Sequence, residues 1–443
     1  MCGKVQLIAL VKSGTGGRRS LEVIAAAVFA ALLLGASRSR GTMKPSGRVH
    51  EVWRLDLPFG NDLQRGSLLE DVSSSGTMLL RSDRYTLVLW RPGEIKPLAK
   101  ISLPVRPKQG QMLSASTECK FGSEENRVLC VRGPWLGLED VGAGKEIRHV
   151  IGTQDFAGLD WDHRKDGAAN TVEGARLPSS PVVVSVNTND GRIAVAYNTL
   201  KNPKILLFSA DLGSTLASWQ AAEYVQDLFW SPNGKSLGVL YFNAYRPFNR
   251  QGKWTGWHPE RDLAGVPDVS IFNVSTGKQV LTFASAGVDA KAAFSPDGKL
   301  IYTIAHFYTG VDYGFGGWTK DTLRAFSSKT GKLVRTFEVE GTGVRNSFAL
   351  SPDGHFIAAS CTKDTRSDWY YLLRLRENLG GDVTAGFVIL DGSSGRVIFR
   401  EKRRMFGDVA TGTLPLFFSA KSDSLVTEFG QPPDQLVAYH ISR

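Results

Sequence analysis

Short apolar segments alternate with polar turns along most of the chain, and one turn sequence recurs. Residues 231–234, 295–298 and 351–354 share the pattern Ser-Pro-Asn/Asp-Gly, and each copy lies between two apolar stretches. Pro presets φ at the first corner, Asn or Asp bonds back to its own backbone, and Gly accepts a positive φ. Each copy therefore predicts a β-hairpin.

Weaker copies of this turn bring the number of predicted hairpins to seven; they occupy residues 73–76, 123–126, 187–191 and 419–422. Successive turns lie 43 to 68 residues apart, whereas a four-stranded propeller blade takes about 40 to 50 residues. A second hairpin with a Gly-containing turn recurs between these turns, as in residues 322–339. The pattern predicts an all-β, seven-bladed β-propeller, and the longer gaps predict loop insertions.

These repeats resemble the WD40-like β-propeller repeats of the PD40 type, in which a Ser-Pro-Asp-Gly turn joins the two inner strands. The resemblance extends from about residue 49 to the C-terminus. No blade opens with Gly-His, and the one Trp-Asp pair, Trp161-Asp162, lies in an irregular region. The stricter WD40 pattern is therefore absent, and the resemblance implies a scaffold without implying an activity.

The seventh predicted blade ends before its outermost strand. Residues 424–429 and 435–442 supply two strands after the last turn, and residues 49–57 alternate like a strand with no other blade to join. We expect this N-terminal strand to complete the last blade, because closure hides the edges that an open ring would expose.

Composition changes this picture little. The 443 residues include 47 Gly and 5 Met, which suits a turn-rich all-β chain, and residues 49–443 are assigned to a single propeller. The net charge of +10 is concentrated at the N-terminus, where residues 1–40 hold six basic residues and one acidic residue. No basic run exceeds residues 402–404, so we expect no nucleic-acid partner.

The N-terminus has the order of a secretory signal. Arg18 and Arg19 precede an apolar run at residues 23–34, and small residues follow it. Residues 1–40 are therefore predicted to be a signal peptide and residues 41–48 a linker, which exports the propeller to a periplasmic or extracellular space. An uncleaved membrane anchor is the alternative, although the run is shorter than the roughly 20 residues of a span. A start at Met43 would instead leave a cytosolic protein.

Two cysteines flank the second inner turn. Cys119 and Cys130 fall on adjacent antiparallel strands, where a disulfide is geometrically allowed. The alternative is a pair of small buried side chains. No Cys-x-x-Cys or zinc-like spacing occurs.

Three consecutive predicted blades carry long insertions at the loop between their second and third strands. They span residues 244–267, 308–321 and 362–384. In a propeller such loops share one face, and aromatic side chains are common at interfaces. The candidate binding residues are Tyr245, Trp254, Trp257, His258, Tyr313, Phe315, Trp318, Trp369 and Tyr370. The alternative is that these rings only pack the insertions onto the propeller.

The central channel offers a second, weaker set of candidates. Asp227, Asp289, Lys291 and Arg345 fall near the innermost strands, where contacts between blades would explain them equally well. A further insertion at residues 133–180 contains Asp160, Asp162 and His163 without the spacing of a calcium loop. We read it as a solvated acidic loop and predict no metal site.

Catalytic motifs are weak. Residues 234–238 match Gly-x-Ser-x-Gly, but they span a hairpin turn and the following strand, whereas a nucleophile elbow needs a strand-to-helix turn. Neither a P-loop nor a dinucleotide fingerprint is present. We predict no catalytic residue and no cofactor.

Three functional hypotheses follow. The first is a noncatalytic exported propeller that binds a protein, peptide or glycan through its aromatic, loop-rich face, and touches a membrane only if the N-terminal segment stays uncleaved. The second is an enzyme of the lactonase or quinoprotein type that uses the central channel. The third is a cytosolic interaction scaffold that starts at Met43.

Overall fold

The chain divides into two compact units, Met1–Pro45 and Ser46–Arg443. The computed structural model describes parts of the second unit, which are listed here by residue number: 49–56, 69–83, 86–94, 96–102, 117–132, 135–143, 145–151, 182–197, 203–223, 225–241, 268–285, 288–308, 318–339, 347–364, 383–405, 414–429 and 435–442. Every regular element in these ranges is a strand, and the ranges contain no helix long and apolar enough to cross a membrane.

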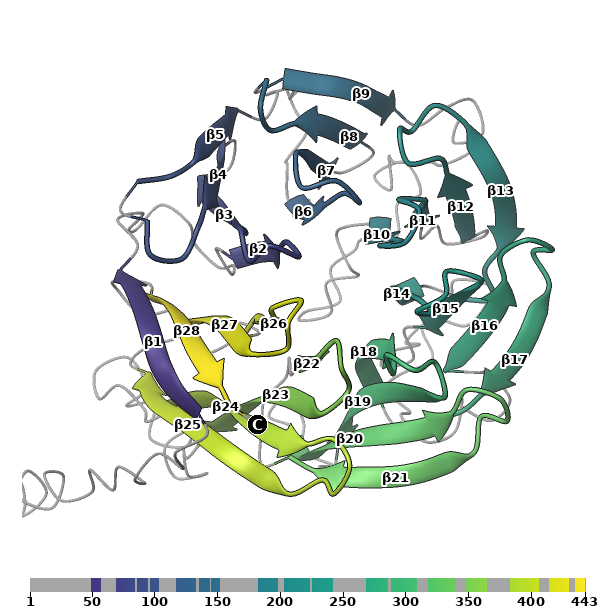
Figure 1. Cartoon of the computed structure of the whole chain (residues 1–443). Coiled ribbons are helices and arrows are strands. Elements are labelled where there is room, and N and C mark those ends of the chain that lie inside the picture. Colours follow the sequence, from purple (N-terminus) through teal and green to yellow (C-terminus); the bar gives the residue numbers. More distant parts are fainter. Residues whose placement is uncertain are drawn as a thin grey trace, which may run out of the picture. The chain divides into compact units, whose positions relative to one another are not determined.

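The strands form seven antiparallel four-stranded sheets arranged as the blades of a β-propeller (Figure 1). Blade 1 consists of β2 (Leu69–Val72), β3 (Met78–Asp83), β4 (Thr86–Trp90) and β5 (Ala99–Ser102). Blade 2 consists of β6 (Thr117–Phe121), β7 (Arg127–Arg132), β8 (Trp135–Asp140) and β9 (Lys145–Ile151). Blade 3 consists of β10 (Val182–Val186), β11 (Ile193–Tyr197), β12 (Lys204–Phe208) and β13 (Thr215–Gln220).

The remaining blades repeat this order from the inner to the outer strand. Blade 4 consists of β14 (Val225–Trp230), β15 (Ser236–Tyr241), β16 (Val269–Asn273) and β17 (Gln279–Phe283). Blade 5 consists of β18 (Val288–Phe294), β19 (Leu300–Tyr308), β20 (Trp318–Ser327) and β21 (Leu333–Glu338). Blade 6 consists of β22 (Phe348–Leu350), β23 (Phe356–Asp364), β24 (Val383–Asp391) and β25 (Val397–Met405). Blade 7 consists of β26 (Leu416–Phe418), β27 (Ser424–Phe429), β28 (Gln435–Ile441) and β1 (Val49–Asp56).

The predicted all-β, seven-bladed propeller with an N-terminal closing strand is confirmed. Strand β1 pairs antiparallel with β28 from Val49 opposite Ile441 to Asp56 opposite Gln435, with one bulge between Glu51 and Trp53. Figure 1 shows this purple strand along the outer edge of the yellow one. The two ends of the propeller therefore share one sheet.

Burial along the strands explains the sequence pattern. Strand β11 is buried at every position because neighbouring blades cover both of its faces, so it reads as a continuous apolar run. The outer strand β13 alternates between exposed and half-buried positions. The sequence signal is consequently strongest in the middle strands and weakest at the rim.

The hydrophobic core is divided among the contacts between blades. Each of the seven clusters of buried side chains in the described ranges draws on two neighbouring blades. Leu69 and Met78 of blade 1, for example, pack with Val426 and Leu436 of blade 7. Because no blade buries its faces alone, the ring is stable only as a whole.

Arg403 reinforces the closure of the ring. Its guanidinium lies 4.0 Å from the ring centroid of Phe429 in blade 7. It also donates to Gln435 at 2.8 Å and lies 3.5 Å from the carboxylate of Glu51 on β1. One side chain of blade 6 thereby contacts three strands of blade 7, which are β27, β28 and the closing strand β1.

The recurrent Ser-Pro-Asp-Gly turn forms a small hydrogen-bonded unit. In blade 5, Ser295 Oγ donates to Asp297 Oδ1 at 2.6 Å and accepts from the backbone N–H of Leu300 at 2.9 Å. Gly298 adopts a φ of +71° and lies against Pro232 of the preceding turn. All seven predicted turns join the first two strands of their blades, as the pattern required.

The outer turns follow a second rule. An aromatic side chain from the outer strand of one blade covers the turn glycine of the next, which pairs Trp219 with Gly277, Phe283 with Gly331 and Phe337 with Gly395. Each of these glycines has a positive φ between 66° and 74°. They combine a left-handed backbone with a close approach, and only glycine meets both needs.

Gly331→Ala is expected to destabilise the protein more than Gly298→Ala. Both positions have a positive φ, which costs about 1–2 kcal/mol for alanine. A Cβ at Gly331 would also lie 2.8 Å from Phe283, whereas at Gly298 the nearest atom is 3.7 Å away. Overpacking adds about 1–3 kcal/mol. Urea denaturation of both variants checks this, and equal losses of stability would contradict the role of the aromatic cover.

The reading of residues 133–180 as one insertion is wrong in part. Its first portion supplies β8 and β9, the third and fourth strands of blade 2. The signal was weak because Gly137 interrupts the apolar pattern of β8 and the exposed β9 carries charged residues. Asp160, Trp161, Asp162 and His163 lie outside the described residues.

Candidate functional site

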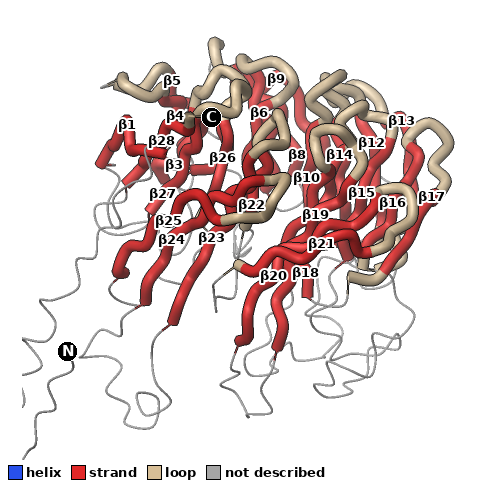
Figure 2. Tube along the Cα trace, turned by 60° about the horizontal axis from the view of Figure 1, so that its bottom comes forward, coloured by secondary structure: helices blue, strands red, loops and turns tan. Residues whose placement is uncertain are grey.

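The three long insertions are anchored at equivalent positions of consecutive blades. They connect β15 to β16 in blade 4, β19 to β20 in blade 5 and β23 to β24 in blade 6. Figure 2 shows the ends of β20, β23 and β24 on the side of the ring away from the short inner turns. The described strands therefore direct these three connections to one face.

Strands β19, β20, β23, β24 and β25 are nine or ten residues long, whereas those of blade 3 have five or six. The added length lies at the insertion end, where Tyr308 pairs with Trp318 and Asp364 with Val383. The predicted loops 308–321 and 362–384 are thus partly strand. The polar runs 319–321 and 362–364 within these strands hid much of the extension from the sequence pattern.

One of the nine aromatic and histidine candidates, Trp318, lies in a described strand. Trp318 begins β20, so it lies in a strand and not in a loop. The following candidates lie outside the described residues: Tyr245, Trp254, Trp257, His258, Tyr313, Phe315, Trp369 and Tyr370. Their role in binding stays a prediction, supported by the shared position of the strands that carry them.

Two of the channel candidates contact the next blade. Asp227 Oδ1 accepts from the N–H of Leu228 at 2.9 Å, and Oδ2 accepts from the N–H of Ala292 in blade 5 at 3.1 Å. Lys291 Nζ lies 5.9 Å from the ring centroid of Phe348 in blade 6. Asp289 lies in β18, and Arg345 lies outside the described residues.

Other charged side chains near the channel do the same, although the sequence did not single them out. Asp71 repeats the geometry of Asp227, accepting from the N–H of Val72 at 2.9 Å and of Phe121 at 2.8 Å. Both aspartates directly follow a bulge in the inner strand. Glu428 accepts from the N–H of Leu69 at 2.7 Å and joins blade 7 to blade 1. These groups accept hydrogen bonds from backbone donors of the neighbouring inner strand.

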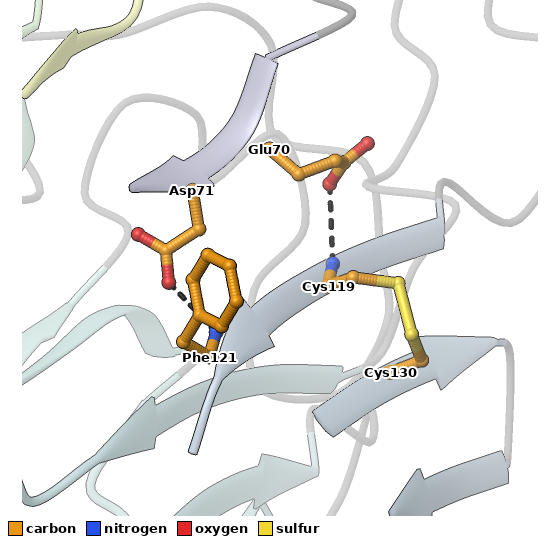
Figure 3. The surroundings of a disulfide bond; sticks show 5 residues. All are labelled: Glu70, Asp71, Cys119, Phe121 and Cys130. Atoms are coloured by element: carbon orange, nitrogen blue, oxygen red, sulfur yellow. Dashed lines mark hydrogen bonds between the residues drawn. A yellow bond between two sulfur atoms is a disulfide. The ribbon is translucent and has the colours of Figure 1, made fainter. Parts of the chain in front are cut away.

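Cys119 and Cys130 form a disulfide between the first two strands of blade 2 (Figure 3). The residues are directly opposite each other, their Cα atoms are 4.2 Å apart, and both are buried. Figure 3 also shows Glu70 and Asp71 of blade 1 accepting from the N–H groups of Cys119 and Phe121. The disulfide therefore links β7 to β6, the strand that is hydrogen-bonded to blade 1.

Two carboxyl groups in the turns have a strongly lowered pKa. The hydrogen bond from Ser295 and that from the N–H of Lys299 lower the pKa of Asp297 to about 2. In the outer turn of blade 6, the hydroxyl of Ser393 and the N–H of Ser394 lower the pKa of Asp391 well below its usual value. Both carboxylates accept hydrogen bonds within their own turns, and these hydrogen bonds favour the ionised form.

Acid is expected to destabilise the propeller through these turns. A carboxyl group whose pKa is lowered by folding stabilises the native state above its unfolded pKa of about 3.9. That contribution is lost as the pH falls through the folded pKa, which is about 2 for Asp297. The melting temperature should therefore fall between about pH 4 and pH 2.

A double variant, Asp297→Asn with Asp391→Asn, provides the control. Blade 4 already has Asn233 and Asn273 at the equivalent positions, where their Oδ1 atoms accept the same kinds of hydrogen bond. The variant keeps the turns but cannot titrate there, so its melting temperature should depend less steeply on pH. An identical pH dependence would show that other groups control acid unfolding.

The Gly-x-Ser-x-Gly match is part of a hairpin. The N–H of Ser236 donates to Ser231 Oγ at 2.9 Å across the turn. Gly238 lies opposite Phe229, and a Cβ there would be 2.2 Å from its ring. The spacing serves the packing of blade 4. Within the described ranges, no three His, Cys, Asp or Glu side chains are grouped so that they could hold a metal.

Comparisons with known proteins add little about function. No protein-family model matches the chain, and no curated protein matches it. Among solved structures, the chain is similar to Kuenenia stuttgartiensis hydrazine synthase with a TM-score of 0.48 and 12% identity, over 73% of this chain and 77% of that chain. A similarity at this level carries no functional argument.

Proposed function

We propose that this protein is an exported, noncatalytic β-propeller of the WD40-like, PD40 type that binds a protein, peptide or glycan partner. The observation that carries the proposal is the insertion of three loops at the same connection of blades 4, 5 and 6. The loops contain eight of the nine aromatic and histidine candidates, and Trp318 begins the strand that follows one of them. Long loops on a rigid scaffold are a common location for binding sites.

The disulfide supports export. Disulfides persist mainly in oxidising compartments, and Cys119 and Cys130 are joined in the core of blade 2. The basic and apolar order of residues 1–40 is consistent with the same compartment. A cytosolic start at Met43 would place this disulfide in a reducing environment.

The channel supports binding chemistry less well than the loops do. Asp71 and Asp227 each use both carboxylate oxygens in backbone hydrogen bonds. A carboxylate engaged in this way has less capacity to hold a ligand or move a proton. The geometry therefore favours the loops as the functional region over a lactonase- or quinoprotein-type channel.

The double variant Trp257→Ala with Trp318→Ala tests the aromatic loops. We expect it to lose at least tenfold in affinity for a partner captured by the unmodified protein, because aromatic anchors contribute about 2 kcal/mol or more at an interface. Its melting temperature should stay within a few degrees of the unmodified value. Unchanged affinity with a large loss of stability would assign these rings to packing.

A further inference from the structure

A cavity of about 510 Å³ opens at the rim between blades 3 and 4, lined by residues of β13 and of the turn between β16 and β17. Figure 1 shows the end of β13 beside that turn. The described residues that line it belong to strands and turns of blades 3 and 4. Its volume falls within the range of about 300–1,000 Å³ that is typical of small-molecule sites.

The cavity has a firm apolar wall. Leu207 and Val274 are buried, and the ring of Trp219 stacks on Phe272 with a centroid distance of 6.2 Å and an interplanar angle of 26°. Leu216, which is 50% exposed, lies at the open edge. This wall matches a ligand with a branched aliphatic or aromatic group.

Arg192 supplies an oriented cationic group. Its Nε donates to Asp190 Oδ2 at 2.7 Å, its Nη2 donates to the carbonyl oxygen of Gly234 at 2.9 Å, and its guanidinium lies 5.4 Å from the Trp230 ring centroid. Within the described residues, Nη1 has no hydrogen-bond partner. The side chain is thus held in place with donors left over, as an anion site requires.

The surrounding charge is positive. Lys235 and Lys278 are both exposed. They lie beside the cavity, since the N–H of the lining residue Val274 donates to the carbonyl of Lys235, and Lys278 directly follows the lining residue Gly277. The one carboxylate bound to Arg192, that of Asp190, is already engaged with its guanidinium and its N–H. An incoming anion would therefore meet a net positive rim.

The combination of side chains is specific to this interface among the described blades. Phe283 and Phe337 occupy the place of Trp219 at the next two interfaces, and in blades 4 and 5 Lys235 and Lys299 follow the inner-turn glycine where Arg192 does in blade 3. Of these three interfaces, only the one between blades 3 and 4 brings together an indole ring and a guanidinium. The repeat itself needs neither.

We propose that this rim cavity binds a carboxylate attached to an apolar group. Nη1 of Arg192 donates to the carboxylate, and the apolar group packs on Trp219, Leu207 and Val274. The site lies apart from the insertion loops, so it is a second binding site whose test does not depend on the partner proposed for them.

N-acetyl-L-phenylalanine and its neutral amide test the proposal on the unmodified full-length protein by isothermal titration calorimetry. We expect saturable binding of the acid and at least tenfold weaker binding of the amide. Because only the ligand changes, the folding of a variant does not enter the comparison. Equal affinities, or no binding of either compound at millimolar concentration, would overturn the proposal.

Two arginine variants locate the site. Arg192→Gln should reduce the affinity for the acid to that for the amide. Arg127→Gln removes another arginine that follows an inner turn, in blade 2, where it pairs with Glu124, and should leave binding unchanged. Acid binding that survives Arg192→Gln, or that is lost equally in Arg127→Gln, would contradict the assignment.

Discussion

The variant Val49→Asp is expected to fail to fold into a soluble protein, whereas Val52→Asp on the same strand should fold normally. Val49 is fully buried among side chains of blades 6 and 7 that include Phe387, Tyr439 and Ile441. Val52 is 56% exposed. A buried carboxylate without a partner costs several kcal/mol, which is a large part of the about 5–15 kcal/mol that stabilises a typical domain.

Deletion of residues 49–56 should likewise prevent folding into a soluble protein. Without β1, the outer edge of β28 loses its strand partner, and Arg403 loses its contact with Glu51. An unpaired edge strand is prone to association with other chains. Size-exclusion chromatography and circular dichroism of the deletion and of both Val variants check this result. A stable, monodisperse deletion protein would refute closure by the N-terminal strand.

Removal of the disulfide is the second change with a large expected effect. Cys119→Ala with Cys130→Ala should lower the free energy of unfolding by about 2–4 kcal/mol. Cys119 lies in the strand whose N–H groups donate hydrogen bonds to Glu70 and Asp71, so loss of the bridge also loosens the contact between blades 1 and 2. Guanidinium denaturation of both proteins measures the difference.

The effect of a reductant separates the bridge from the packing of the two side chains. Dithiothreitol should destabilise the unmodified protein by a similar amount and should leave the double variant unchanged. Mass spectrometry of the untreated protein should show the two cysteines joined. If reductant has no effect on the unmodified protein, and both thiols react with an alkylating reagent after unfolding, the bridge is absent from the native protein.

The architecture could be predicted because its determinants are local. Each inner turn needs a few residues with known backbone preferences, and the glycine at 298 takes the positive φ that its turn demands. The closing strand was also predictable, because the seventh blade was one strand short and residues 49–57 alternate. Local signals of this kind do not depend on which blade comes next in space.

Contacts between blades could not be predicted in the same way. Asp71 and Asp227 bond to strands about 50 and 65 residues further along, and only their position after a bulge marks them. The cavity at Arg192 and Trp219 likewise depends on how two blades meet. The ends of the long hairpins in blades 5 and 6 were predicted to be loops because they contain the polar runs 319–321 and 362–364. Pairing with a neighbouring strand overrides that preference.

The central claim is that a closed ring serves as a scaffold and that the three insertions bind the partner. Capture of partners by the full-length protein, compared with a variant whose loops 242–267, 309–317 and 365–382 are each replaced by a short Gly-Ser linker, tests it most directly. We predict that the trimmed variant keeps its melting temperature and its β-sheet circular dichroism spectrum but captures none of the partners. Capture of the same partners in equal amounts by the folded, trimmed variant would contradict the account.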